Sequence, residues 1–451
     1  MKDKFTEMPH SKAYVDFSQD KGQLCLKNHS YGIGGVNSMP MPKSVVDGMA
    51  KLKPKLIRIF IQEFFYILDD NGNYDFSKLD PYMEAVNDTG ASVVASICIK
   101  PHMLYPVVDE NIWMPNDVSK WQEAIAEMVK RYSVDNNYVT YWGVGNEINI
   151  GEYGGCPYRI NDVKDYFEYY KMTVDAILKT CPDTKVGGPS FAGVSQDTYK
   201  FFEDFIALCK NDNIQLDFIS YNIYSDSFDY HASSARKIKD IAGDIEVFVT
   251  EMNIGIGGEP SIEEKAYDSK RAAGLAAIIY EYNEKAPEVG TFQYHIYDQY
   301  CDPSEFSPFY ARHRYMANHW DDEPHRLGLF DLDGNERPQY QMYAMLNDLA
   351  DTRVEASTEN TDIRVIASKD DDKVTLFMTN YNGATSLDTV MSLYFKNCVS
   401  GMAQLTVERI DNIGHPGVHV TEDRLTYIHE DFWFSLFIPA DSCVKVTISF
   451  K

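Results

Sequence analysis

The sequence is short of basic residues and has no long apolar run. It contains 42 Lys and Arg against 68 Asp and Glu, a formal net charge of −26 at pH 7. Such a charge disfavours nucleic acid and anionic membranes as partners. No apolar run is long enough to span a bilayer. We therefore expect neither nucleic-acid nor membrane binding, and a polyanionic sugar would need a local basic pocket.

Recognisable metal and cofactor motifs are absent as well. The eight cysteines include no Cys-x-x-Cys pair, which argues against a zinc ribbon or a thioredoxin-like motif. Residues 69–75 have their glycine misplaced for an EF-hand loop, and His313, His319 and His325 lack the spacing of metal ligands. The Gly-rich residues 32–37 lack the Lys-Ser/Thr ending of a P-loop, and no dinucleotide fingerprint fits. We predict no metal and no cofactor.

The N-terminal segment gives two expectations about location. Residues 1–20 are polar and lack the apolar core of a signal peptide. We expect a cytoplasmic protein if Met1 is native, and a secreted or periplasmic one if a leader was removed.

Between residues 31 and 350, short apolar segments alternate with helical patterns. Candidate strands begin at Tyr31, Leu56, Ser92, Tyr138, Lys185, Asp217, Glu246 and Thr291. They are continuous apolar runs, as expected when both faces of a parallel sheet are covered. Residues 117–132 and 261–282 have helical spacing, with Asp117 and Ser261 as expected N-caps. Because a βα unit needs about 30 residues or more, the spacing predicts an α/β fold, a (β/α)8 TIM barrel.

The pattern changes near residue 351. Helical periodicity stops, and short alternating strands are separated by polar turns such as residues 370–372. This pattern predicts a C-terminal β-sandwich over residues 351–451. Residues 1–30 precede the barrel and are expected to add a strand to that sandwich. We expect the two parts to pack closely.

Two glutamates stand directly after apolar strands. Glu147 ends the segment from Tyr141, and Glu251 ends the segment from Val247. A lone Glu after a strand is more often an exposed loop residue, so a catalytic interpretation depends on both glutamates. The active site of such a barrel lies at the C-terminal ends of the strands, and the fourth and seventh strands face each other across its mouth. One protonated and one ionised carboxyl group there would suit hydrolysis of a glycosidic bond.

Further segments carry a likeness to a known group of enzymes. They are Tyr74-Asp75-Phe76 with Leu79-Asp80, residues 117–132, Gly187-Gly188-Pro189-Ser190, Asp217-Phe218-Ile219-Ser220, and residues 330–340. With Asn146-Glu147 and Glu251, they resemble the clan A glycoside hydrolases. The chain is most similar to glycoside hydrolase family 39, which includes β-xylosidases and α-L-iduronidases. A barrel followed by a β-sandwich is also that family's layout.

The resemblance implies roles for the residues at the barrel mouth. Glu147 would be the general acid/base and Glu251 the nucleophile. Asn146 would bond the sugar's 2-hydroxyl, a contact that strengthens in the transition state. Arg58 on strand two would keep Glu251 ionised, with a structural ion pair as the alternative. Tyr224 would donate a hydrogen bond to Glu251, with ordinary packing as the alternative.

Two positions depart from the pattern within the expected substrate-binding group. Asn222 has an amide where the family's strand-six histidine is expected. His295 on strand eight would line the sugar pocket or else be a core histidine, and Tyr294-His295 stands where many clan members have a tryptophan. Ile148 also replaces the usual proline after Asn-Glu. These departures leave the sugar specificity open.

The sequence therefore predicts a retaining glycoside hydrolase that removes terminal sugars by double displacement. Its substrate would be an oligosaccharide or small glycoside, and β-xylosidase is the best single prediction. The alternatives are another clan A activity, such as arabinofuranosidase or β-glucosidase, and a non-catalytic carbohydrate-binding barrel. Linkage and oligomeric state are left open.

Overall fold

The chain forms the predicted closed barrel of parallel strands. The computed structural model describes residues 8–255, 267–322, 326–383, 385–413 and 417–451. The barrel runs in the order β2 to β9. Its strands are β2 (Ser30–Gly32), β3 (Leu56–Gln62), β4 (Ser92–Cys98), β5 (Val139–Val144), β6 (Lys185–Ala192), β7 (Phe218–Tyr224), β8 (Glu246–Asn253) and β9 (Gly290–Tyr294). Each begins within one residue of its predicted start.

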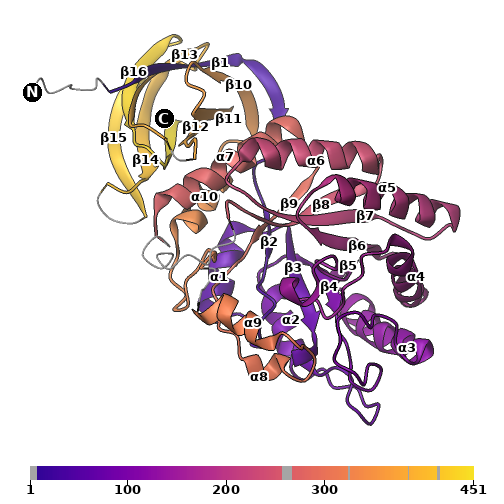
Figure 1. Cartoon of the computed structure of the whole chain (residues 1–451). Helices are drawn as coiled ribbons and strands as arrows, with labels where there is room; N and C mark the ends of the chain where they lie inside the picture. Colours follow the sequence, from indigo (N-terminus) through magenta and orange to yellow (C-terminus); the bar gives the residue numbers. More distant parts are fainter. Residues whose placement is uncertain (1–7, 256–266, 323–325, 384, 414–416) are drawn as a thin grey trace, which may run out of the picture.

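Helices surround the barrel (Figure 1). They are α1 (Lys43–Leu52), α2 (Leu79–Asn87), α3 (Val118–Val129), α4 (Val163–Thr180), α5 (Gln196–Asn211), α6 (Phe228–Ala242), α7 (Ser269–Lys285) and α10 (Pro338–Asn347). Asp117 caps α3 as predicted, because its side chain accepts a hydrogen bond from the Lys120 backbone N–H. Ser261 lies outside the described residues, and α7 begins later than predicted, with Asp268 as its N-cap.

Short helical segments follow three of the barrel strands. They are η1 (Glu63–Phe65) after β3, η3 (Gly151–Gly154) after β5, and α8 (Pro303–Phe306), α9 (His313–Ala317) and η4 (Asn318–Asp322) after β9. A further segment, η2 (Lys130–Asp135), continues α3. The segments after the strands lie at the carboxyl ends of the barrel, where they shape its mouth.

The second part of the chain is a nine-stranded, mostly antiparallel sheet. Its order is β15-β14-β17-β12-β11-β10-β1-β13-β16. The strands are β1 (His10–Gln23), β10 (Thr352–Thr358), β11 (Ile363–Lys369), β12 (Lys373–Asn380), β13 (Thr389–Lys396), β14 (Gly401–Ile410), β15 (Val418–Ile428), β16 (Phe432–Ile438) and β17 (Ser442–Phe450). β1 pairs antiparallel with β10 and parallel with β13.

The layers of this sandwich belong to one continuous sheet that curls around its own core (Figure 1). Leu405 on β14 and Leu436 on β16 stand near opposite ends of the strand order, yet they share one buried apolar cluster. The curl brings them together. Strands that are neighbours in this sheet are not always neighbours in the sequence. β1 lies between β10 and β13, which follow it by more than 300 residues.

The curled sheet packs directly on the barrel. Ile366 and Phe377 on the sheet belong to the same buried cluster as the barrel residues. Arg364 donates a hydrogen bond of 3.0 Å from Nε to Oε1 of Glu281 on α7. The contact fixes the sheet against α7, on the outside of the barrel (Figure 1).

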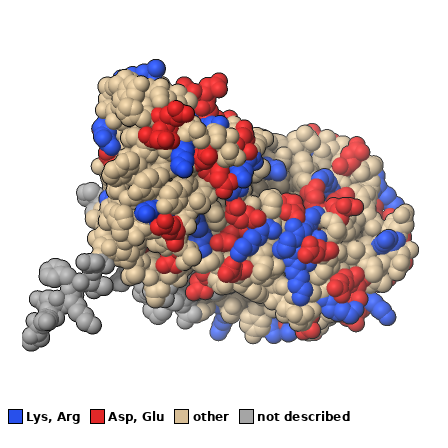
Figure 2. Space-filling view, turned by 90° about the horizontal axis from the view of Figure 1, so that it is seen from above, with Lys and Arg blue, Asp and Glu red and all other residues tan. Residues whose placement is uncertain are grey.

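Charges are interspersed over the surface. On the face shown in Figure 2, the described Lys and Arg side chains alternate with Asp and Glu, and no broad basic field is visible. No helix within the described ranges has the length and apolar character needed to cross a bilayer.

Candidate active site

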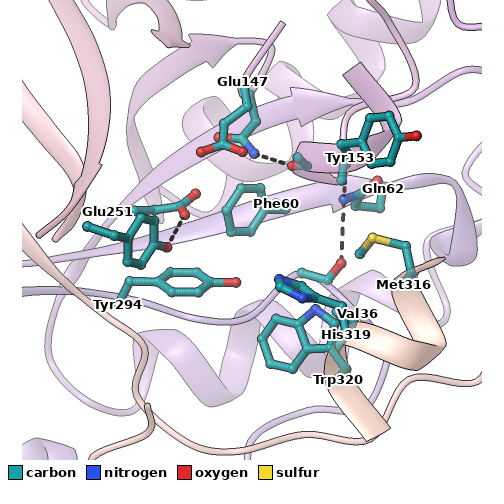
Figure 3. Close-up of a pocket in the computed structure, with 15 residues that line it drawn as sticks. Val36, Phe60, Gln62, Glu147, Tyr153, Glu251, Tyr294, Met316, His319 and Trp320 are labelled. Carbon is teal, nitrogen blue, oxygen red and sulfur yellow. Dashed lines mark hydrogen bonds between the residues drawn. The ribbon is translucent and has the colours of Figure 1, made fainter. Parts of the chain in front are cut away.

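A cleft of about 480 Å³ opens at the carboxyl ends of the barrel strands. Glu147, Glu251, Asn146 and Tyr224 all line it. Its other lining residues are Gly35, Val36, Phe60, Gln62, Tyr153, Gly154, Gly155, Tyr294, Met316, His319 and Trp320 (Figure 3). The structure thus brings four of the predicted site residues into one cavity with many aromatic rings.

Glu147 is presented by a tight turn after β5. Gly145 has φ of +87° and Glu147 itself has φ of +43°, which is uncommon for a residue with a side chain. The Glu147 backbone N–H donates to the Ser190 carbonyl on β6 at 2.7 Å. The side chain lies against Gly154, where a Cβ atom would be only 2.2 Å from Glu147 Oε2. The turn, the neighbouring strand and the glycine together fix the direction of the carboxyl group.

Glu251 lies within β8, and a local irregularity of the sheet aligns it. The register between β7 and β8 shifts between Tyr221 and Asn222, after which Asn222 pairs with Glu251. Such irregularities re-aim side chains and often occur beside active sites. Glu251 Oε1 accepts a hydrogen bond from Arg58 Nη1 at 2.8 Å, and Oε2 accepts one from the Tyr224 hydroxyl at 2.5 Å.

Arg58 joins the two sides of the site. Its guanidinium is fully buried. Besides Glu251, it donates to Asn146 Oδ1 at 2.7 Å and to Ser96 Oγ at 3.0 Å. A buried cation is tolerated only when it is paired and hydrogen-bonded. Arg58 therefore links the end of β8 to the residue that precedes Glu147.

Asn222 contacts Glu147 and does not line the cleft. It is fully buried, and its Nδ2 donates to Glu147 Oε1 at 2.9 Å. Its Oδ1 accepts a hydrogen bond from Thr250 Oγ1 at 2.8 Å, which fixes the orientation of the amide. The predicted role of Asn222 in substrate binding is therefore not reflected in a direct place on the cleft wall. Its side chain is turned to the carboxyl group, beneath the cleft surface.

His295 is likewise absent from the cleft wall. It follows the last residue of β9 and is fully buried, while Tyr294 and Trp320 line the cleft. The Trp320 ring lies 5.1 Å from the His295 ring and covers it. Burial lowers the pKa of His295 to about 4. Of the two expectations for His295, the structure places it as a buried histidine behind Trp320, which lines the cleft in its place.

The two carboxyl groups have different surroundings. Burial, and then the negative charge of Glu251, raise the pKa of Glu147 to about 8, against the opposing effects of Asn222 and Arg58. Glu147 is therefore protonated at neutral pH. Because Oε1 accepts from Asn222, the proton belongs on Oε2. Glu251 accepts from a guanidinium and a phenol, partners suited to a charged carboxylate.

Most of the aromatic wall was not predicted from the sequence. Tyr153 stands in Gly151-Glu152-Tyr153-Gly154-Gly155, and a glycine-flanked aromatic so soon after Glu147 was an available signal. Met316 and Trp320 had no comparable signal, because they lie in a long loop after β9.

Two of the three histidines considered as metal ligands, His313 and His319, are described, and their surroundings differ. His319 lines the cleft, His313 bonds the Tyr310 carbonyl, and His325 lies outside the described residues. Within the described ranges, no group of three or more His, Cys, Asp or Glu side chains is placed to hold a metal ion.

Comparison with known proteins gives consistent matches. The sequence pattern of Glycosyl hydrolases family 39 matches residues 54–416. A β-xylosidase of Caldicellulosiruptor saccharolyticus is 21% identical over 378 residues, 76% of this chain and 72% of that protein. A β-xylosidase of Geobacillus stearothermophilus is 22% identical over 223 residues, 44% of this chain, and the match spans only 43% of that relative's length.

A solved structure matches the whole chain. The GH39 enzyme from Xanthomonas axonopodis pv. citri superimposes with a TM-score of 0.77 at 15% identity, covering 100% of this chain and 99% of that one. At this identity the match concerns the fold alone.

Proposed function

Because this chain belongs to glycosyl hydrolase family 39 and is a glycoside hydrolase, we propose that it is a retaining, exo-acting β-xylosidase. The observation that carries the mechanism is the pairing in one cleft of Glu147, whose pKa is raised to about 8, with Glu251, which is held by two donors. A protonated acid and a charged nucleophile are the two groups that double displacement requires.

In the first step, a Glu251 oxygen attacks the anomeric carbon. The glycosidic C–O bond breaks, and Glu147 gives its proton to the departing oxygen. The product is a covalent glycosyl-enzyme with Glu147 ionised. In the second step, Glu147 takes a proton from water, the water oxygen attacks the same carbon, and Glu251 leaves as a carboxylate.

Arg58 and Tyr224 hold the nucleophile during both steps. Their hydrogen bonds to the two Glu251 oxygens are of the kind that suits a carboxylate, and they fix its direction of attack. Asn146 lines the same cleft, and its Nδ2 donates one hydrogen to the Gly154 carbonyl at 2.8 Å. The second hydrogen is available for the sugar's 2-hydroxyl.

The cleft favours a neutral sugar. Its described lining includes no Lys or Arg, and burial lowers the pKa of His319 to about 4, so this imidazole is uncharged at neutral pH. Arg58 is fully buried and engaged with Glu251 and Asn146. Among the described lining residues, a uronic acid would bring a third carboxylate into this site without a cation to meet it. This supports a xyloside over an iduronide.

A panel of 4-nitrophenyl glycosides tests the proposal. We expect the β-D-xyloside to have the highest kcat/KM, with α-L-arabinofuranoside and β-D-glucoside as the competing substrates. Proton NMR of the first-formed sugar should show the β-anomer. An α-anomer would overturn double displacement, and preference for another glycoside would overturn the xyloside assignment. Sugar binding without any turnover would favour the non-catalytic barrel.

A further inference from the structure

The two ends of the cleft are built differently. Glu251 and Tyr294 lie toward one end, and Tyr153 lies at the other end, beyond Glu147 (Figure 3). Tyr153 lines the cleft although 47% of its surface is exposed. It directly precedes Gly154, on which the Glu147 side chain packs. Tyr153 is therefore an exposed aromatic ring at the mouth, on the side of the proposed acid.

The Tyr153 ring is held in place by contacts from the loop after β9. The Tyr315 ring meets it edge-on, with centroids 4.9 Å apart and planes at 85°. The Arg312 guanidinium lies 4.6 Å from the Tyr153 centroid, a cation–π contact. Tyr315 in turn stacks on His319, which lines the cleft, at 5.4 Å and 17°. Aromatic side chains thus continue from the cleft to its rim.

Two buried carboxylates fix Arg312. Its Nη1 donates to Glu110 Oε1 at 2.6 Å. The Glu152 carboxylate accepts the backbone N–H groups of Ala311 and Arg312 at 3.1 and 2.7 Å. Glu110 and Glu152 are only 5% and 1% exposed. Buried charges are costly unless fully paired, and here their pairing fixes the position of the cation beneath the exposed ring.

The same cluster ties three loops together. Glu110 follows β4, Glu152 follows β5, and Arg312 follows β9. The Glu152 N–H donates to Glu110 Oε2 at 2.9 Å, and a Cβ atom on Gly151 would lie 2.4 Å from that oxygen. The glycine permits this close approach. The Tyr153 ring is therefore preorganised, which reduces the entropy lost when a ligand stacks on it.

We propose that Tyr153 forms the leaving-group subsite and stacks on the neutral sugar ring that the enzyme releases. The inference rests on the proposed function, in which Glu147 protonates the oxygen that joins the terminal sugar to the leaving group. The leaving group must then lie beside Glu147 and Gly154, and Tyr153 is the next residue along the cleft. Arg312 is a positioning residue, because it acts through the ring.

The subsite also has a role after the first bond is cleaved. A sugar bound on Tyr153 presents its hydroxyl where water would otherwise attack. Glu147 then takes the proton of that hydroxyl, the sugar oxygen bonds the anomeric carbon, and the bond to Glu251 breaks. The product is a new glycoside, so the subsite supports transfer to sugar acceptors.

The test compares two substrates that differ only in the leaving group. Xylobiose releases a sugar, and β-D-xylosyl fluoride releases a single atom that is too small to contact Tyr153. Tyr153→Ala should lower kcat/KM for xylobiose about tenfold more than for the fluoride, the loss expected from one aromatic contact. Tyr153→Phe keeps the ring, so its ratio of kcat/KM for xylobiose to kcat/KM for the fluoride should stay within about twofold of the wild-type ratio.

Tyr427→Ala is the matched control, because Tyr427 is 50% exposed on β15, outside the cleft. This substitution should leave kcat/KM unchanged for both xylobiose and the fluoride. If Tyr153→Ala lowered kcat/KM equally for both substrates, or for neither, the assignment of Tyr153 to the leaving-group subsite would be overturned. The proposed function would still stand. Failure of the wild-type enzyme to hydrolyse either substrate would instead overturn the proposed β-xylosidase activity.

Discussion

The surroundings of Glu147 predict how activity depends on pH. Acid catalysis needs the protonated form of Glu147, and its pKa is raised from 4.5 to about 8. At pH 7 about 90% of the group then carries the proton, against about 0.3% at a pKa of 4.5. Because ionisation removes the acid, kcat/KM should fall as pH rises, with a midpoint near pH 8 and about tenfold per unit beyond it.

Asn222 provides the perturbation that tests this cause. Its amide donates to Glu147 Oε1 at 2.9 Å, and this hydrogen bond lowers the pKa of Glu147. Asn222→Ala removes the donor that stabilises the charged form. The midpoint of the basic limb should therefore move to higher pH, by up to about one unit, the scale of a single hydrogen bond to a charged group.

The assay is the pH profile of kcat/KM for a xyloside whose leaving group requires protonation, such as methyl β-D-xyloside. Asn149→Ala is the control. Asn149 lies two residues after Glu147, and its amide donates a hydrogen bond to the Ala192 carbonyl and not to the Glu147 carboxyl group. Its profile should match that of the wild type. A wild-type midpoint near pH 5, or a downward shift in Asn222→Ala, would refute the assignment of Glu147 as the protonated acid.

Three other substitutions test the nucleophile, the placement of the acid, and the contact between the sheet and the barrel. Glu251→Gln should lower kcat for every glycoside by roughly 10⁴-fold or more, because no nucleophile remains; near-normal turnover would contradict its role. Gly154→Ala places a Cβ 2.2 Å from Glu147 Oε2, so kcat/KM should fall roughly 100-fold for methyl β-D-xyloside and much less for a 2,4-dinitrophenyl xyloside; equal losses would point to misfolding. Arg364→Met removes the 3.0 Å bond across the sheet–barrel contact and should lower the free energy of unfolding by about 2–4 kcal/mol with kcat unchanged; an unaltered thermal midpoint would count against that contact.

The parts of the site that the sequence predicted all lie on or beside barrel strands. Arg58 stands within an apolar run whose register is visible in the sequence, and Glu251 ends another such run. Strand order and parallel pairing then bring their side chains to one edge. That Arg58 reaches Glu251 was implied by the resemblance to clan A glycoside hydrolases, and the structure shows the contact at 2.8 Å.

The parts that the sequence did not predict depend on contacts between loops. Trp320 occupies the wall expected for His295, because the loop after β9 folds back across the strand end. That path is set by pairings such as Arg312 with Glu110, which lie 202 positions apart in the chain. Periodicity carries no information about such pairings, since they depend on side chains from separate βα units.

The residues on strands and the residues on loops also have different proposed functions in the cleft. In the proposed mechanism, Glu251 on its strand attacks the anomeric carbon and Arg58 holds its carboxylate, where fixed geometry is required. Tyr153 and Trp320 come from loops that close over the mouth, and loops are where barrels of this kind vary their specificity. A change of preferred leaving group should therefore be obtainable at Tyr153 and Arg312 with the pH midpoint near 8 retained. If substitutions at Tyr153 or Arg312 shifted that pH midpoint as strongly as Asn222→Ala, the loop residues would influence the ionisation of Glu147. Leaving-group preference and acid catalysis would then not be independent, which would contradict this prediction.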